Sequence, residues 1–174
     1  MIRISIRLEE YRMILTAIYQ CEETKDLPIK FNVHLSKKSS NITEIRGNLT
    51  YTMPFDDSTV WDVNIASWSL TGGWKPNSIV YVTNNGCSKL RNILGNAWDY
   101  VSKGFQIPTA NCPQPTGIFK SSGLDTTFIK DNNFPKMYFY GKYKYVGKLK
   151  NKNNKLLGCL VIEFNLVRPW ESIL

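Results

Sequence analysis

Apolar and polar residues alternate along most of this chain, which is the pattern of a β-strand with one buried face. The alternation runs through residues 2–8, 29–35, 45–51, 61–65, 139–149 and 156–166. Around residue 46 the polar positions Glu44, Arg46 and Asn48 share one side, and we expect that side to face solvent. Segment 79–83 is short and apolar, and turn signals such as Gly72-Gly73 separate the strands.

One segment breaks this pattern with apolar residues at helical spacing. These residues are Leu90, Ile93, Leu94, Ala97, Trp98 and Val101. They predict one short helix over about residues 88–103, with Ser88 as N-cap and Gly104 as C-terminal stop. Because strands precede and follow this single helix, the sequence predicts an all-β fold, an antiparallel sandwich or cup.

The length of 174 residues fits one domain over residues 1–174, since no linker, repeat or low-complexity tract divides the chain. Aromatic residues make up 13% of the sequence, which suits strands. No run of 18 apolar residues occurs, so no transmembrane helix is expected. A secretory signal needs an unbroken apolar stretch, and charged residues such as Arg3, Arg7 and Glu9 interrupt the N-terminal segment.

The chemistry of a catalytic or metal site is not visible in the sequence. The single histidine, His34, lies on the polar side of an alternating segment, where a solvated residue is expected. The adjacent carboxylates Asp56 and Asp57 occupy a predicted turn, whereas a glycosidase needs two carboxyls facing each other across a bond. We therefore expect no enzyme activity, no cofactor and no metal site.

The net charge of +8 is concentrated in one segment. Residues 136–155 hold seven of the 22 basic residues and no acid, so the rest of the chain is almost neutral. On a strand, Lys142, Lys144, Lys148 and Lys150 would share a face. That face is either a solvated strand protected against aggregation or a surface attracted to anionic membranes.

The four cysteines, Cys21, Cys87, Cys112 and Cys159, form no CxxC pair and allow three disulfide pairings or four free thiols. Two sequons place candidate glycosylation sites at Asn41 and Asn48. Together they favour an oxidising, secretory compartment. Since no signal is visible, we expect the printed chain to lack the true start of its precursor.

Short motifs in a fixed order carry a family resemblance. They include Cys87-Ser88-Lys89-Leu90, Cys112-Pro113, Gly117-Ile118-Phe119, Gly141-Lys142-Tyr143-Lys144 and the segment 155–162. Their order resembles the ganglioside GM2 activator family over roughly residues 19–168. Upstream, Gly47-Asn48-Leu49-Thr50, segment 54–57 and segment 73–77 look like the insect branch, the CheB-type chemosensory proteins.

The resemblance implies a β-cup around an apolar cavity that holds a lipid, in a carrier without enzyme activity. It also implies the disulfides Cys21–Cys159 and Cys87–Cys112. Vertebrate members carry further cysteines in the loops at the cavity mouth, and this chain has none. Residues 1–18 have no clear counterpart in the family.

We therefore expect a secreted or lysosomal carrier of a lipid or other apolar small molecule, such as a glycolipid or a pheromone-type ligand. Two alternatives are a docking cofactor that presents lipid to a glycosidase or receptor, and an intracellular nucleic-acid-binding domain, which the sequons and cysteines disfavour. Transient contact with anionic membranes fits the lysine-rich face. Candidate cavity residues are Trp61, Trp68, Trp74, Phe105, Phe119, Phe128, Phe139 and Tyr143.

Overall fold

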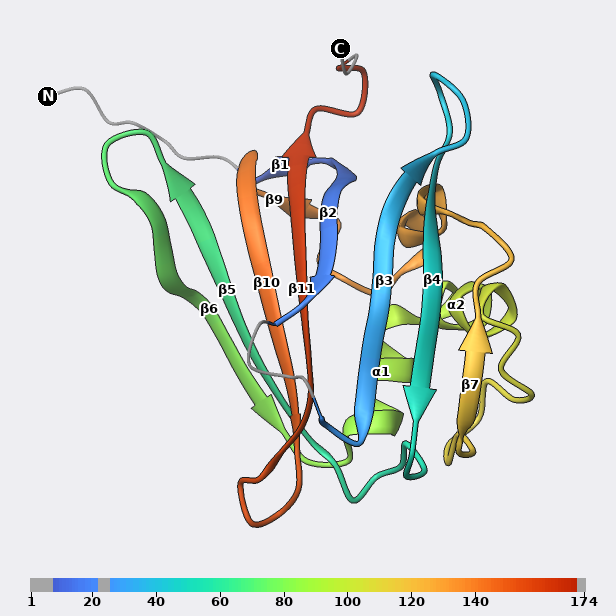
Figure 1. Ribbon diagram of the computed structural model, residues 1–174. Helices are drawn as coiled ribbons and strands as arrows, with labels where there is room; N and C mark the ends of the chain where they lie inside the picture. Colours follow the sequence, from blue (N-terminus) through green and yellow to red (C-terminus); the bar gives the residue numbers. More distant parts are fainter. Residues whose placement is uncertain (1–7, 22–25, 172–174) are drawn as a thin grey trace, which may run out of the picture.

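The computed structural model describes residues 8–21 and 26–171. The alternating segment expected over residues 2–8 lies outside them, apart from Leu8. The described chain confirms the all-β prediction, since antiparallel sheets make up most of it (Figure 1). A five-stranded sheet has the order β2 (Arg12–Gln20), β11 (Leu156–Val167), β10 (Gly141–Lys150), β5 (Val60–Ser69) and β6 (Gly73–Thr83).

A second sheet has the order β3 (Ile29–Lys37), β4 (Thr43–Tyr51) and β7 (Gly117–Lys120), and β8 (Leu124–Asp125) also pairs with β4. Strands β1 (Glu9–Glu10) and β9 (Met137–Tyr138) form a small ribbon at one end of the five-stranded sheet (Figure 1). The two main sheets meet where β2 runs beside β3, and there the backbone N–H of Phe31 donates to Oε1 of Gln20 at 2.9 Å. This contact joins the sheets without a continuous ladder.

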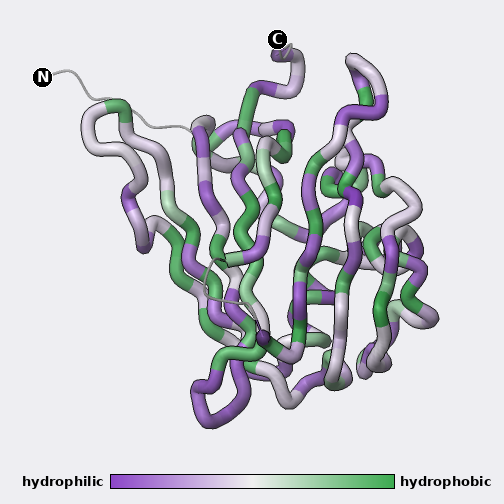
Figure 2. Tube along the Cα trace, viewed as in Figure 1, coloured by the Kyte–Doolittle hydropathy of each residue, from purple (hydrophilic) through white to green (hydrophobic). Residues whose placement is uncertain are grey.

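The core lies between the sheets because their apolar faces are turned toward each other. The alternation predicted for β3 holds, with Ile29 and Val33 buried and His34 exposed. The buried cluster draws on both sheets and on the helical segment, and its members include Leu15, Leu49, Trp61, Trp98, Phe119 and Phe164. The polar turn between β10 and β11 projects from the end of the sheet opposite the β1–β9 ribbon (Figures 1 and 2).

The predicted single helix is two helices, α1 (Gly86–Leu94) and α2 (Asn96–Gly104). Gly95 separates them with φ 56° and ψ −129°, a conformation that interrupts the helix and that residues with a Cβ rarely adopt. Asn133 packs against this break, because a Cβ at position 95 would lie 2.7 Å from its side-chain nitrogen. The second helix ends at Gly104, as the sequence predicts.

The prediction of Ser88 as N-cap is wrong. Helix α1 begins two residues earlier, and its N-cap position, Asn85, makes no side-chain capping bond. A carboxylate distant in sequence takes that role, since Asp57 accepts bonds from the backbone N–H of Ser88 at 2.8 Å and from its hydroxyl at 2.5 Å. The adjacent Asp56 accepts from the backbone N–H of Ser58. Both carboxylates therefore hold local structure.

Glu44 does not face solvent as its place in the alternation predicts. It is buried on the outer side of β4, where Arg46 lies 2.9 Å and Lys38 lies 3.6 Å from its carboxylate oxygens. Gly123 packs so closely that an added Cβ would meet a carboxylate oxygen at 2.2 Å. A loop from another part of the chain thus covers a polar strand position.

Both disulfides implied by the resemblance are present. Cys21 pairs with Cys159 and links β11 to the chain just after β2, while Cys87 pairs with Cys112 and ties α1 to the loop before β7. These bonds are compatible with an extracellular or lumenal location. In the ranges that the structure covers, no helix is long and apolar enough to cross a membrane.

Candidate functional site

A chain of aromatic rings leads from the surface of the molecule into the core, beside the β1–β9 ribbon. Phe139 is 41% exposed, and its ring centroid lies 5.4 Å from that of Tyr138. Tyr138 contacts Tyr143 at 6.0 Å, and Tyr143 stacks on buried Phe164 at 5.6 Å. The contiguous rings form an apolar row that runs from the solvent-exposed Phe139 to the core between the sheets.

Tyrosine hydroxyls hold the backbone around these rings by donating hydrogen bonds to carbonyl groups. Tyr143 donates to the carbonyl of Phe139 at 3.0 Å, Tyr11 to that of Pro135 at 2.5 Å, and Tyr140 to that of Glu10 at 2.8 Å. Burial raises the pKa of Tyr143 above 10.0, and the nearby Tyr138 adds to the shift. The phenol of Tyr143 is therefore a neutral donor at physiological pH. We call five residues of this region the rim. Three are exposed and apolar, Leu8, Met137 and Phe139, and the other two are Tyr138 and Tyr143.

The eight candidate cavity residues fall into three groups. Trp61, Phe105, Phe119 and Tyr143 are buried in the core, and Phe128 packs against it. Phe139 lies at the rim. Trp68 and Trp74 pair across β5 and β6 on the outer face of the five-stranded sheet, away from the core. The sequence pattern thus brings five of these residues to the interior, one to its edge and two to the opposite face.

The two outer tryptophans form a cluster with two lysines of the central strand β10. The Nζ of Lys142 lies 5.0 Å from the Trp68 ring centroid and 5.3 Å from that of Trp74, and the Nζ of Lys144 lies 4.7 Å from Trp74. These are cation–π distances. The tryptophan rings contact each other edge to face at 5.1 Å. We name these four residues the Trp–Lys cluster.

The other two lysines of the predicted stripe have a different setting. The Nζ of Lys150 lies 2.9 Å from the carboxylate of Asp62, so its charge is paired. Lys148 is the cross-strand neighbour of the same Asp62. All four lysines share the outer face, because they alternate with the inward Tyr143 and Tyr145. The stripe nevertheless divides into an aromatic end and a charge-compensated end.

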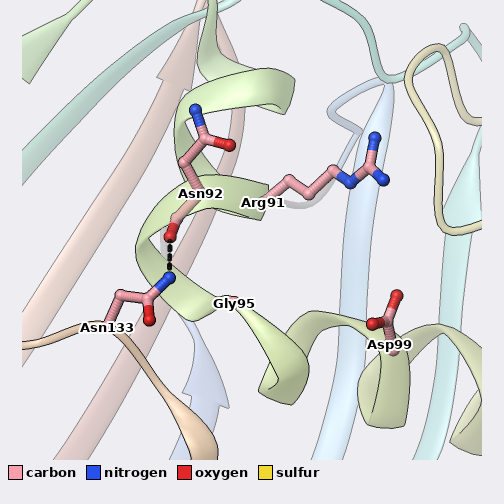
Figure 3. A pocket seen from close by; sticks show the side chains of 5 residues that line it. All are labelled: Arg91, Asn92, Gly95, Asp99 and Asn133. Carbon is pink, nitrogen blue, oxygen red and sulfur yellow. Dashed lines mark hydrogen bonds between the residues drawn. The ribbon is translucent and has the colours of Figure 1, made fainter.

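Two hollows lie outside the space between the sheets. One is an open groove of about 520 Å³ on the outer face of the five-stranded sheet, lined in part by Trp74, Lys144 and Lys148. The other lies at the junction of α1 and α2, where Asn133 donates to the carbonyl of Asn92 at 2.7 Å and Arg91 and Asp99 flank the opening (Figure 3).

The sequons occupy accessible positions on the second sheet. Asn41 is exposed in the turn between β3 and β4, and Asn48 is half-buried on β4, opposite Asn32. The Asn48 side chain lies on the face away from the core, as the alternation predicts.

Two features of the site could not be predicted from the sequence: the place of Tyr138 at the rim and the pairing of tryptophans with lysines. Tyr138 ends the two-residue strand β9, which is too short for an alternating pattern to mark it. The Trp–Lys cluster depends on the register between β5, β6 and β10, which alternation within one strand does not fix.

A scan against protein-family models finds no match to this sequence, and a search of curated proteins also finds none.

Proposed function

We propose that this protein is a non-enzymatic carrier of lipids or other apolar small molecules, which it takes up through the rim into the space between its sheets. The observation that supports this most directly is the aromatic chain from exposed Phe139 to buried Phe164. Transfer of apolar surface from water favours such a site by roughly 0.8 kcal/mol per methylene. A long acyl or hydrocarbon chain would therefore gain most by reaching the core.

The rim has the composition that uptake of an apolar chain needs. Met137 and Phe139 are exposed on one side of the ribbon, and Leu8 is exposed where β1 begins. Tyrosine hydroxyls hold the carbonyls of Phe139 and Glu10, so side chains of the rim can rotate aside while this backbone stays in place. In this proposal Tyr138 and Phe139 move first, because they separate solvent from Tyr143.

Contact with an anionic membrane is the second part of the proposal, and the Trp–Lys cluster supports it. Tryptophan rings and lysine side chains both favour the interface of a bilayer. Leu70, 98% exposed in the turn between β5 and β6, extends the cluster with an apolar side chain. This turn and the rim lie at the same end of the five-stranded sheet (Figure 1). A membrane contacted through the cluster would thus have the rim nearby.

We place the carrier in a secretory setting, outside the cell or in the lysosomal lumen. The two disulfides are compatible with that setting, and glycosylation at Asn41 and Asn48 would accompany it. A chemosensory role, with a pheromone-type ligand, follows from the family resemblance. Presentation of a bound lipid to a glycosidase or receptor is the alternative use of the same site.

Displacement of a fluorescent fatty-acid probe from the disulfide-intact protein tests the proposal. We expect lipids to displace the probe with affinity that rises with chain length, and Phe139→Ala to weaken probe binding about three- to tenfold through lost apolar contact. Tyr100→Ala is the matched control, because Tyr100 is an exposed aromatic residue on α2. Absence of probe binding to the folded protein would overturn the carrier proposal and favour a docking role.

A further inference from the structure

Strand β6 forms an edge of the five-stranded sheet that no other element of the described chain covers. Within residues 8–21 and 26–171 it pairs only with β5, and Figure 1 shows its other side open. Edge strands present unpaired backbone N–H and C=O groups, and proteins usually protect them with charges, prolines or bulges. The upper part of β6 has such protection in Lys75, Pro76 and the irregular pairing near Asn77.

The lower part of the same strand has none of these devices. Residues 78–85 contain no charge and no proline, and residues 79–83 are Ile, Val, Tyr, Val and Thr, which all favour strands. Val80 is 57% and Val82 59% exposed, on the outer face of the sheet. The hydropathy colouring shows this run as a hydrophobic stretch along the outer edge (Figure 2).

We propose that a second copy of this chain occupies the β6 edge, so that two copies join their five-stranded sheets across a two-fold axis. An isologous, self-complementary contact of this kind closes as a dimer. The symmetry makes the two β6 strands antiparallel and keeps corresponding sheet faces on one side. The lack of charge over residues 78–85 supports self-pairing, because no like charges meet across the axis.

The register follows from the same residues. With the axis at Tyr81, Val80 of one copy lies opposite Val82 of the other, and Ile79 opposite Thr83. Every pair from 79 to 83 then joins apolar or β-branched side chains, whereas an axis at Val80 would place Val82 opposite Ser78. The dimer would also carry both Trp–Lys clusters on one face, since each lies on the outer face of its sheet. Two linked membrane contacts bind more strongly than one.

The test is sedimentation velocity of the full, disulfide-intact protein over about three decades of concentration. We expect a monomer–dimer equilibrium that saturates at two copies. Val80→Lys with Val82→Lys should weaken dimerisation at least tenfold, because the introduced ammonium groups face each other across the axis. Val80→Lys with Val82→Glu should restore a salt-sensitive dimer, since opposite charges then meet in the proposed register.

Ile118→Lys is the matched control. Ile118 is 68% exposed on β7, the short edge strand of the other sheet, so this substitution adds a similar charge to a different edge. We expect it to leave dimerisation unchanged, with near-ultraviolet circular dichroism confirming that every variant is folded. A wild type that stays monomeric, equal dimerisation of the double-lysine variant, or species that grow beyond two copies would each overturn the proposal.

Discussion

The indole N–H of Trp61 donates a hydrogen bond to the phenolic oxygen of Tyr145 at 2.8 Å. This pair links the neighbouring strands β5 and β10 on the inner face of the five-stranded sheet. Gly147 makes room for it, because a Cβ there would lie 2.1 Å from the Tyr145 hydroxyl oxygen. A buried indole N–H needs a hydrogen-bond acceptor. Gly147 therefore leaves the space in which the hydroxyl of Tyr145, on the same strand, can accept from Trp61.

Tyr145→Phe tests the value of that bond. Removing the acceptor leaves the N–H of Trp61 buried without its partner, and we expect the free energy of unfolding to fall by about 1–3 kcal/mol. Urea denaturation measures the change. Tyr19→Phe is the control, because the hydroxyl of Tyr19 donates to Glu163 on the exposed outer face. Loss of that hydrogen bond should lower the free energy of unfolding by less than about 0.5 kcal/mol. Equal losses in both variants would contradict the assigned role of Tyr145.

Alkaline pH should destabilise the fold. Burial raises the pKa of Tyr51 and of Tyr145 above the ordinary value of 10.0. The unfolded chain therefore releases these two protons from about pH 10 upward, while the folded protein retains them. Their stabilising contribution is complete below pH 10 and is lost as the pH rises above it, at up to about 1.4 kcal/mol per pH unit for each tyrosine.

Urea denaturation between about pH 8 and 11 measures this slope. Comparison with Tyr145→Phe isolates one group, because the variant keeps Tyr51 and all lysines. We expect the variant to show the shallower decline above pH 10. Parallel curves for the two proteins would show that Tyr145 titrates alike in both states.

The carboxylate of Asp57 should stabilise helix α1 from outside the helix. Asp57→Ala removes an acceptor for both the backbone N–H and the hydroxyl of Ser88, and we expect a loss of about 1 kcal/mol in the free energy of unfolding. Ser88→Ala removes only the hydroxyl donor and should cost less. Thermal unfolding of the two variants ranks them, and the reverse order would refute capping by Asp57.

The two halves of the lysine stripe should differ in membrane binding. Lys142→Gln with Lys144→Gln removes two charges that lie over tryptophan rings, and we expect about a 30-fold loss of binding to anionic vesicles at low salt, from roughly 1 kcal/mol per lysine. Lys148→Gln with Lys150→Gln removes the same formal charge but leaves Asp62 without its partner. It should cost less than about fivefold, because the proposed contact is made through the Trp–Lys cluster and these two lysines lie at the other end of β10.

Vesicle co-sedimentation compares the two variants at rising ionic strength. Binding of the wild type should weaken steeply with salt, because the Debye length is only about 8 Å at physiological ionic strength. Equal losses for both pairs would show that net charge alone governs the contact. No loss for either pair would mean that the stripe is simply a solvated strand face.

The sequence by itself determined the all-β class, the buried face of strands with clear alternation such as β3 and β10, and the approximate place of the helical segment, because side-chain period is a property of each strand alone. It did not fix which strands are neighbours. Register and pairing brought Trp68 and Trp74 beside Lys142, placed Asp57 at the start of α1, and let Gly123 cover Glu44. These contacts join residues distant in sequence, and only the tertiary structure decides them, because local periodicity says which face a residue takes but not what lies across from it.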